Sequence, residues 1–264
     1  FVPAFTCHVV VEPFLEDGYD VYPYSLNRDL SVNWDNVMRD VEIYNPSVVL
    51  LHSYFGINTL PDASEYISEL KKRGVYIIED ETHSMFSDFE HLDTPYHIGS
   101  IRKWLPIPDG AYITGLDHKA LSADNDVELV NAKLKAMIEK SDYITHSRIE
   151  KTLYREIFVI AEEILDTRRA TYGMSDVSIR MYNATAWDSY YQARRLNYNY
   201  LSENINNSSV IPILPKCREC EVPFMFPVYV KGAETRIKLQ RYMVENKVFP
   251  TIIWGIPEGI KTTI

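Results

Sequence analysis

The sequence predicts an α/β protein built on a mainly parallel sheet. Short apolar runs at residues 47–53, 75–78 and 96–99 each end abruptly in polar residues. Continuous apolar runs of this kind are typical of strands that are covered on both faces. A stretch with helical periodicity lies between the first two of these runs. Regular alternation of strands and helices favours parallel strands joined by right-handed crossovers.

The individual elements follow from local patterns along the chain. Amphipathic stretches that begin at a capping residue predict helices, and short apolar or alternating stretches predict strands. The predicted helices cover residues 7–15, 34–45, 60–73, 127–140, 148–171, 179–201 and 233–246. The predicted strands cover residues 1–5, 20–24, 47–53, 75–78, 96–99, 111–114, 222–230 and 248–254. A polar stretch at residues 116–126 has no clear periodicity and is predicted to be a linker.

Single residues fix the ends of the first elements. Gly18 and Gly74 suit the C-terminal ends of the helices that precede them. Asn33 can cap the second helix, and Pro46 blocks its continuation. Pro23 lies in a predicted strand, which indicates a position near the edge of a sheet. The third predicted helix starts beyond a threonine at position 59, which we expect to be its cap.

Composition and charge exclude several classes of function. With 27 Lys and Arg against 37 Asp and Glu, the net charge of −10 argues against a general nucleic-acid or membrane-surface binder. No apolar run approaches the roughly 20 residues of a spanning helix. Cys7, Cys217 and Cys220 give no disulfide framework, which favours a cytoplasmic protein. Cys217 and Cys220 form a lone C-x-x-C, for which we prefer a polar loop, and no metal site is expected.

Two charged residues mark a candidate site at the ends of predicted strands. Asp80 ends one apolar run, and Lys103 follows the next, where ligands of open α/β sheets bind. A lysine amine can form a Schiff base with pyridoxal phosphate, and a carboxylate can keep the pyridine nitrogen of this cofactor protonated. Each residue alone is more often a solvated charge or a turn residue. Their order and placement together predict a pyridoxal phosphate site.

The residues around this pair resemble a known family. The segments IEDETH at residues 78–83 and GSIRK at residues 99–103 are similar to fold-type I pyridoxal phosphate enzymes, and most of all to the DegT/DnrJ/EryC1/StrS sugar aminotransferases. The resemblance implies an aminotransferase-like, three-layer large domain with a mainly parallel sheet at residues 1–207. It also implies a smaller α/β C-terminal domain at residues 208–264.

The resemblance assigns a role to four residues. It implies that Asp80 pairs with the pyridine nitrogen and that His83 lies beside the cofactor ring or its phenolic oxygen. Ser100 would contact the phosphate, and Lys103 would be the Schiff-base lysine. For His52, at the end of an earlier strand, a structural role is at least as expected as substrate contact.

The implied activity is a pyridoxal phosphate-dependent transamination between a small-molecule amino donor and a keto acceptor. In the family the donor is usually glutamate and the acceptor a keto-sugar nucleotide. A homodimer is also implied, because the family builds each site from two subunits. A lyase or decarboxylase on the same scaffold would keep Asp80 and Lys103 unchanged.

Two departures from the family pattern favour an alternative to an active aminotransferase. Cys7 stands where the family has an aromatic residue on the cofactor ring, which leaves Phe5 and His8 as the nearest substitutes. No phosphate-binding Gly/Ser/Thr turn precedes Phe1, so the chain is expected to lack the family's N-terminal segment. The alternative is therefore a non-catalytic or degenerate relative with a structural or regulatory role.

Overall fold

The computed structural model describes residues 1–117, 124–146, 150–214, 216–255 and 257–261. The chain forms two compact units. The first combines Phe1–Pro95 with Tyr191–Ile264, and the second consists of Tyr96–Tyr190. Most of the predicted linker and the predicted start of a helix at residue 148 lie outside the described residues. The domain boundary after residue 207 stays a prediction.

The first unit begins with four short strands. β1 (Val2–Pro3) pairs in parallel with β2 (Pro23–Tyr24), and β3 (Val48–His52) pairs in parallel with β4 (Tyr76–Asp80). Two backbone hydrogen bonds place β1 beside β3: Leu50 N donates to Phe1 O over 2.8 Å, and the amino group of Phe1 donates to Val48 O over 2.7 Å. The spatial order is therefore β2–β1–β3–β4, which confirms the predicted α/β class with a mainly parallel sheet.

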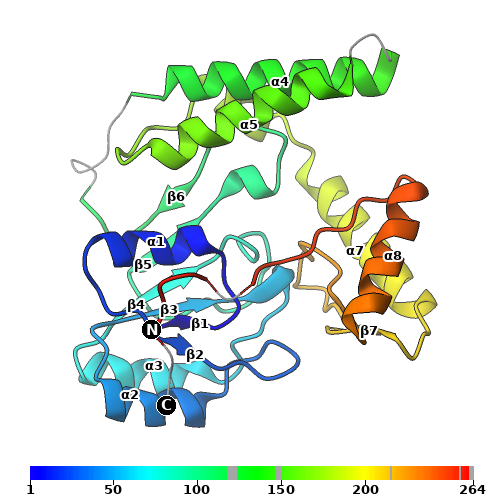
Figure 1. Ribbon diagram of the computed structural model, residues 1–264. Coiled ribbons are helices and arrows are strands. Elements are labelled where there is room, and N and C mark those ends of the chain that lie inside the picture. The colour runs from blue at the N-terminus through cyan, green and yellow to red at the C-terminus, as the bar shows by residue number, and fades with distance from the viewer. Residues whose placement is uncertain (118–123, 147–149, 215, 256, 262–264) are drawn as a thin grey trace. The chain divides into compact units, whose positions relative to one another are not determined.

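Helices connect these strands and cover both faces of the sheet. α1 (His8–Glu16) lies on one side of the strands, whereas α2 (Trp34–Tyr44) and α3 (Ala63–Lys72) lie on the other (Figure 1). Strand order changes direction between β1 and β3, because α1 leads from β1 outward to β2 and α3 leads from β3 outward to β4. In open α/β sheets, ligands bind beyond the carboxyl ends of the two strands that flank such a reversal.

Of the two N-terminal caps predicted for these helices, one was right and one was wrong. The side chain of Asn33 accepts a hydrogen bond from Asn36 N over 3.1 Å and so caps α2, as predicted. Thr59 does not cap α3, which begins after Asp62. The Thr59 hydroxyl instead accepts from Tyr54 N over 3.0 Å, so it is used within the turn that follows β3.

The main core lies between the sheet and the helices α2 and α3. Its apolar side chains come from both layers and include Val37, Val41, Val49, Leu51, Ile67, Leu70 and Ile77. Because side chains alternate between the faces of a strand, Val49, Leu51 and Ile77 point to this core. His52 and Asp80 therefore belong to the opposite face, the one on which α1 lies.

The rest of the first unit differs from the sequence prediction at three places. It contains most of α7 (Trp187–Asn204), an antiparallel pair of β7 (Val210–Pro212) and β8 (Val228–Val230), and α8 (Ala233–Glu245). β7 was not predicted. The predicted strand at residues 222–230 shrinks to β8, and the predicted strand at residues 248–254 is irregular.

Tertiary hydrogen bonds explain why residues 222–224 form a loop. Val222 N donates to Ser87 Oγ over 2.9 Å, and Phe224 N donates to Phe55 O over 2.7 Å. These bonds take up the backbone donors that a strand ladder would use. Pro223, between them, has no backbone donor to give to a ladder.

This loop lies close against the backbone of Gly56. Its φ is +81°, and an added Cβ would lie 1.9 Å from Val222 O. We expect Gly56→Ala to lower the free energy of unfolding by about 2 kcal/mol or more, because overpacking adds to backbone strain. Gly18→Ala is the matched control, since Gly18 also has a φ of +81° but open space around its Cβ position. Denaturant unfolding of both variants measures the difference, and an equal loss in both would contradict the steric argument.

The second unit combines a short antiparallel pair with helices. β5 (Tyr96–Gly99) pairs with β6 (Tyr112–Ile113), and the 3-10 helix η2 (Ile101–Lys103) follows β5. α4 (Val127–His146) and α5 (Lys151–Thr167) lie side by side, and α6 (Asp176–Asn183) follows them (Figure 1). None of the helices in the described part of the chain has the length and apolar character needed to cross a bilayer.

The single helix predicted at residues 179–201 is wrong, because the chain breaks it into α6 and α7. The side chain of Ser175 caps α6 by accepting from Ser178 N. Asp109 accepts from the Ser175 backbone N–H over 2.8 Å and from the Ser175 hydroxyl over 2.7 Å, which fixes the start of α6. Between the helices, the Thr185 hydroxyl donates to Met181 O over 2.9 Å. Side-chain bonds of this kind compete with helix continuation.

Candidate active site

The carboxylate of Asp80 lies at the end of β4, beside the end of β3. The parallel register pairs His52 directly with Asp80. Nδ1 of His52 lies 2.9 Å from Asp80 O and 3.5 Å from Asp80 Oδ2. Thr82 N donates to Asp80 Oδ1 over 2.9 Å. Both side chains of the pair are buried.

The surroundings of Asp80 keep its carboxyl group ionised. Burial alone would raise the pKa of Asp80, but the charge and hydrogen bond of His52 and the hydrogen bonds of Thr82 outweigh burial and lower this pKa to about 2. A buried carboxylate that stays charged suits a partner with a positive charge.

His83 joins this pair through a second hydrogen bond. Nε2 of His52 lies 3.1 Å from Nδ1 of His83, and both rings are buried. The carbonyl oxygen of Asp80 can only accept, so Nδ1 of His52 carries a proton. A second proton then lies in the hydrogen bond between Nε2 of His52 and Nδ1 of His83. Asp80, His52 and His83 thus form one hydrogen-bonded chain.

Aromatic rings hold His83 in place. Its imidazole is nearly parallel to Trp254, with centroids 5.5 Å apart, and to Phe224, with centroids 4.5 Å apart. The ring of Phe55 stacks on it at 5.2 Å. Phe5 belongs to the same aromatic group, since its ring lies 5.1 Å from that of Trp254. Stacking on several rings restricts His83 to one orientation.

Two buried hydroxyl groups near these strand ends have no hydrogen-bond partner within the described part of the chain. They belong to Ser53, which follows β3, and to Ser84, which follows His83. Buried polar groups in folded proteins are nearly always paired, so each such exception calls for an explanation. Both hydroxyls flank the Asp80–His52–His83 chain in sequence.

Ser100 and Lys103 lie together in the second unit. Ser100 directly follows β5, and Lys103 ends the adjoining turn, where its N–H donates to Ser100 O over 3.3 Å. Gly110 O accepts from Ile101 N over 3.1 Å and so closes the loop. Trp104, next to Lys103, is buried, and its carbonyl accepts from the Tyr190 hydroxyl. Lys103 itself is exposed on this anchored loop.

The four residues predicted from the sequence thus fall into two pairs. Asp80 and His83 are linked through His52 in the first unit, and Ser100 and Lys103 are neighbours in the second. His52 is the residue that the sequence analysis undervalued, although the polar end of its strand was a usable signal. Trp254 and Phe224 gave no signal in the sequence, because they come from segments far along the chain.

Comparisons with known proteins support the fold. No family model matches the sequence, and no curated protein is significantly similar to it. The chain is similar to the structure of S. venezuelae DesV in complex with ketimine intermediate, with a TM-score of 0.57, 12% identity and coverage of 94% of this chain. It is also similar to the aminotransferase TlmJ from Streptoalloteichus hindustanus, with a TM-score of 0.59, 13% identity and coverage of 97%. The chain spans 61% of the DesV chain and 65% of the TlmJ chain.

Proposed function

We propose that this chain binds pyridoxal phosphate and belongs to an aminotransferase. The observation that carries the proposal is the buried chain of Asp80, His52 and His83 at the carboxyl ends of β3 and β4. The fold similarity to the aminotransferase TlmJ supports it. A pKa of about 2 keeps Asp80 negatively charged, as a protonated pyridine nitrogen requires.

The residues present fit this cofactor. Asp80 would face the pyridine nitrogen, and His83 would lie beside the ring or its phenolic oxygen. The unpaired hydroxyls of Ser53 and Ser84 offer hydrogen bonds to its polar groups. When bound, pyridoxal phosphate supplies an electron sink for bonds at the substrate's amino carbon.

Each residue of the proposed site would then have a limited task. His52 orients Asp80 by donating from Nδ1 and links it to His83 through Nε2. Ser100 would bind the phosphate. Lys103 would hold the cofactor covalently through Nζ and, once released, move a proton at the reacting carbon.

We further propose the finer assignments that the resemblance implies. The chain would belong to the DegT/DnrJ/EryC1/StrS sugar aminotransferases, with glutamate as amino donor and a keto-sugar nucleotide as acceptor. It would act as a cytoplasmic homodimer, with residues 1–207 as the large domain and residues 208–264 as the small one. The fold similarity to DesV and TlmJ supports this reading.

Reductive trapping tests the proposal. Purified full-length protein is incubated with pyridoxal phosphate, its visible absorption is recorded, and borohydride then fixes any Schiff base for peptide mass spectrometry. We expect a visible band and a cofactor adduct on Lys103. Lys103→Ala should lose both, because the variant has no amine at this position. Lys135→Ala, which removes an exposed lysine of α4, should keep both.

The opposite outcome would favour the alternative function. If the full-length protein forms no adduct, or if Lys103→Ala forms it unchanged, Lys103 does not hold the cofactor. The absence of any band would favour a non-catalytic relative. A band without transamination of glutamate, together with release of carbon dioxide or cleavage of another amino acid, would favour a decarboxylase or lyase.

A further inference from the structure

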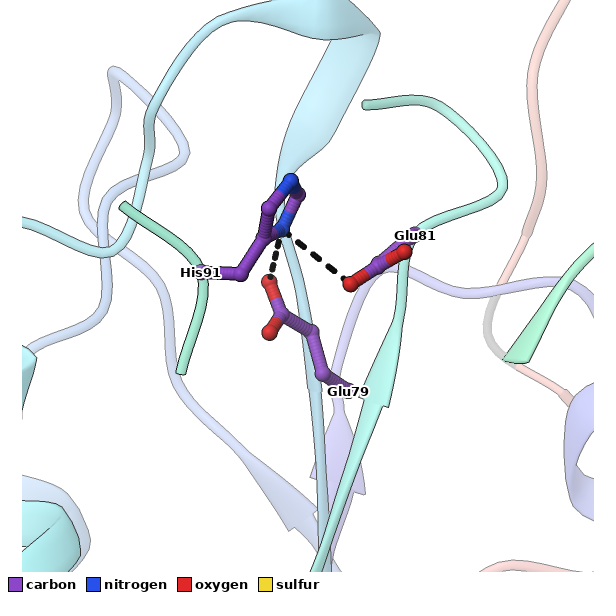
Figure 2. A group of neighbouring side chains, drawn as sticks. All are labelled: Glu79, Glu81 and His91. Carbon is purple, nitrogen blue, oxygen red and sulfur yellow. Dashed lines mark hydrogen bonds and ion pairs between the residues drawn. The ribbon is translucent and has the colours of Figure 1, made fainter. Parts of the chain in front are cut away.

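Glu79, Glu81 and His91 converge on the face of β4 opposite to that of Asp80. Figure 2 shows the three side chains directed toward one another. Nδ1 of His91 lies 3.1 Å from Glu79 Oε1 and 3.2 Å from Glu81 Oε1. One ligand atom from each residue lies within 4.8 Å of the other two. Glu79 and Glu81 meet because residues two apart on an extended strand point to the same side.

The two distances between His91 and the carboxylates suit a metal ion. Imidazole nitrogen and carboxylate oxygen bind zinc at about 2.0–2.2 Å. Two ligands at that distance from one tetrahedral ion are therefore about 3.4 Å apart, and two neighbours around an octahedral ion are about 3 Å apart. Both nitrogen–oxygen distances at His91 lie in this range. One imidazole and two carboxylates form a donor set that suits zinc and related divalent transition metals.

Neighbouring groups already orient two of the three ligands. Leu92 N donates to Glu79 Oε2 over 2.7 Å, which leaves Oε1 facing His91. The ring of Phe89 lies 5.3 Å from the imidazole of His91. Outer contacts of this kind fix ligand orientation in metal sites. A site also needs an entry path, and the exposed fractions of 1% for Glu79, 11% for Glu81 and 30% for His91 place this path on the His91 side.

We propose that Glu79, Glu81 and His91 bind one divalent transition-metal ion, with water completing its coordination. The ion would tie His91, at the far end of the segment that follows β4, back to the strand itself. This segment carries His83, so the ion would stabilise the part of the chain that presents His83. The site does not depend on the proposed function, because Asp80 points to the other face of β4.

The sequence predicted no metal site, because Cys217 and Cys220 stand alone without a second ligand pair. Cys217 and Cys220 belong to a turn organised by Glu221, whose carboxylate accepts from Arg218 N over 2.8 Å. In the described ranges of the chain, no third ligand residue joins these two thiols. The signal for the new site was present as two glutamates at a strand end followed by a histidine.

Metal binding to the full-length protein tests the proposal. Protein stripped with a chelator is dialysed against Zn²⁺ or Mn²⁺, and bound metal is measured by mass spectrometry; Co²⁺ reports coordination by its visible spectrum. We expect one ion per chain and a rise in the melting temperature. His91→Gln and Glu81→Gln should each weaken binding at least about 100-fold, because outer contacts alone are worth 10- to 100-fold. Circular dichroism checks that both variants fold.

Two controls separate this site from other binding. Glu90→Gln removes an exposed carboxylate of the same segment and should leave binding unchanged. The double variant Cys217→Ser/Cys220→Ser should bind as the natural protein does. No stoichiometric ion in the natural protein, or unchanged affinity in folded His91→Gln and Glu81→Gln, would overturn the proposal. Loss of binding in the cysteine variant alone would assign the ion to the thiols and overturn it as well.

Discussion

Asp80→Asn should reduce transamination by roughly 100- to 1,000-fold, the range found when one preorganised electrostatic contact is removed. Asparagine keeps the shape of the side chain and can still accept from Thr82 N, which Asp80 does over 2.9 Å. It lacks the negative charge that would keep the pyridine nitrogen protonated. The loss should therefore appear in kcat, with a change in the visible spectrum of the bound cofactor.

The control for this experiment is Asp88→Asn, which neutralises an exposed carboxylate eight residues further on. It should leave kcat and the spectrum unchanged. Melting temperatures of both variants show whether Asp80→Asn remains folded. A folded Asp80→Asn with unaltered kcat would contradict the role of Asp80, whereas Lys103 could still bind the cofactor.

Glu221→Ala should lower the free energy of unfolding by about 1–3 kcal/mol, the cost of leaving hydrogen-bond donors without their buried acceptor. Only 1% of the Glu221 side chain is exposed. Its Oε1 accepts from Asn58 N over 3.0 Å and from Arg218 Nη2 over 2.8 Å, and its Oε2 accepts from Arg218 N over 2.8 Å. Alanine would leave these donors without their acceptor and would release the C-x-x-C turn from the segment after β3. Chemical denaturation measures the loss.

Two substitutions in the same turn serve as comparisons for the stability loss of Glu221→Ala. Glu219→Ala removes an exposed carboxylate from the same turn and should change stability by less than about 0.5 kcal/mol. Arg218→Ala should cost less than Glu221→Ala, because the Arg218 side chain is 59% exposed and Glu221 would keep its two backbone donors. Equal stability of Glu221→Ala and Glu219→Ala would show that the buried contacts of Glu221 do not stabilise the fold.

Local sequence patterns predicted most of the first 80 residues correctly. The runs at residues 47–53 and 75–78 became β3 and β4, and Asn33 caps α2 as expected. These features depend on nearest neighbours, because periodicity, capping and strand burial are properties of a few consecutive residues. The same patterns were less reliable in the C-terminal part, where Thr185 interrupts a helix and Val222 forms a loop through distant partners.

The candidate site likewise contains some residues that the sequence identified and others that it missed. The sequence singled out Asp80, His83, Ser100 and Lys103 from their residue types and spacing at strand ends. It could not rank His52, whose importance depends on the register that pairs β3 with β4. Nor could it find Trp254 beside His83, since no local pattern reports which ring stacks on which.

The sequence by itself therefore determined the α/β class and the placement of an acid and a lysine at strand ends. Only the tertiary structure decided which groups meet: His52 with Asp80, Glu221 with Asn58, and His91 with Glu79. The physical reason is that alternation along a strand sets the face of each side chain, while its partner on that face comes from packing between distant segments. A buried charge acquires its role from that partner.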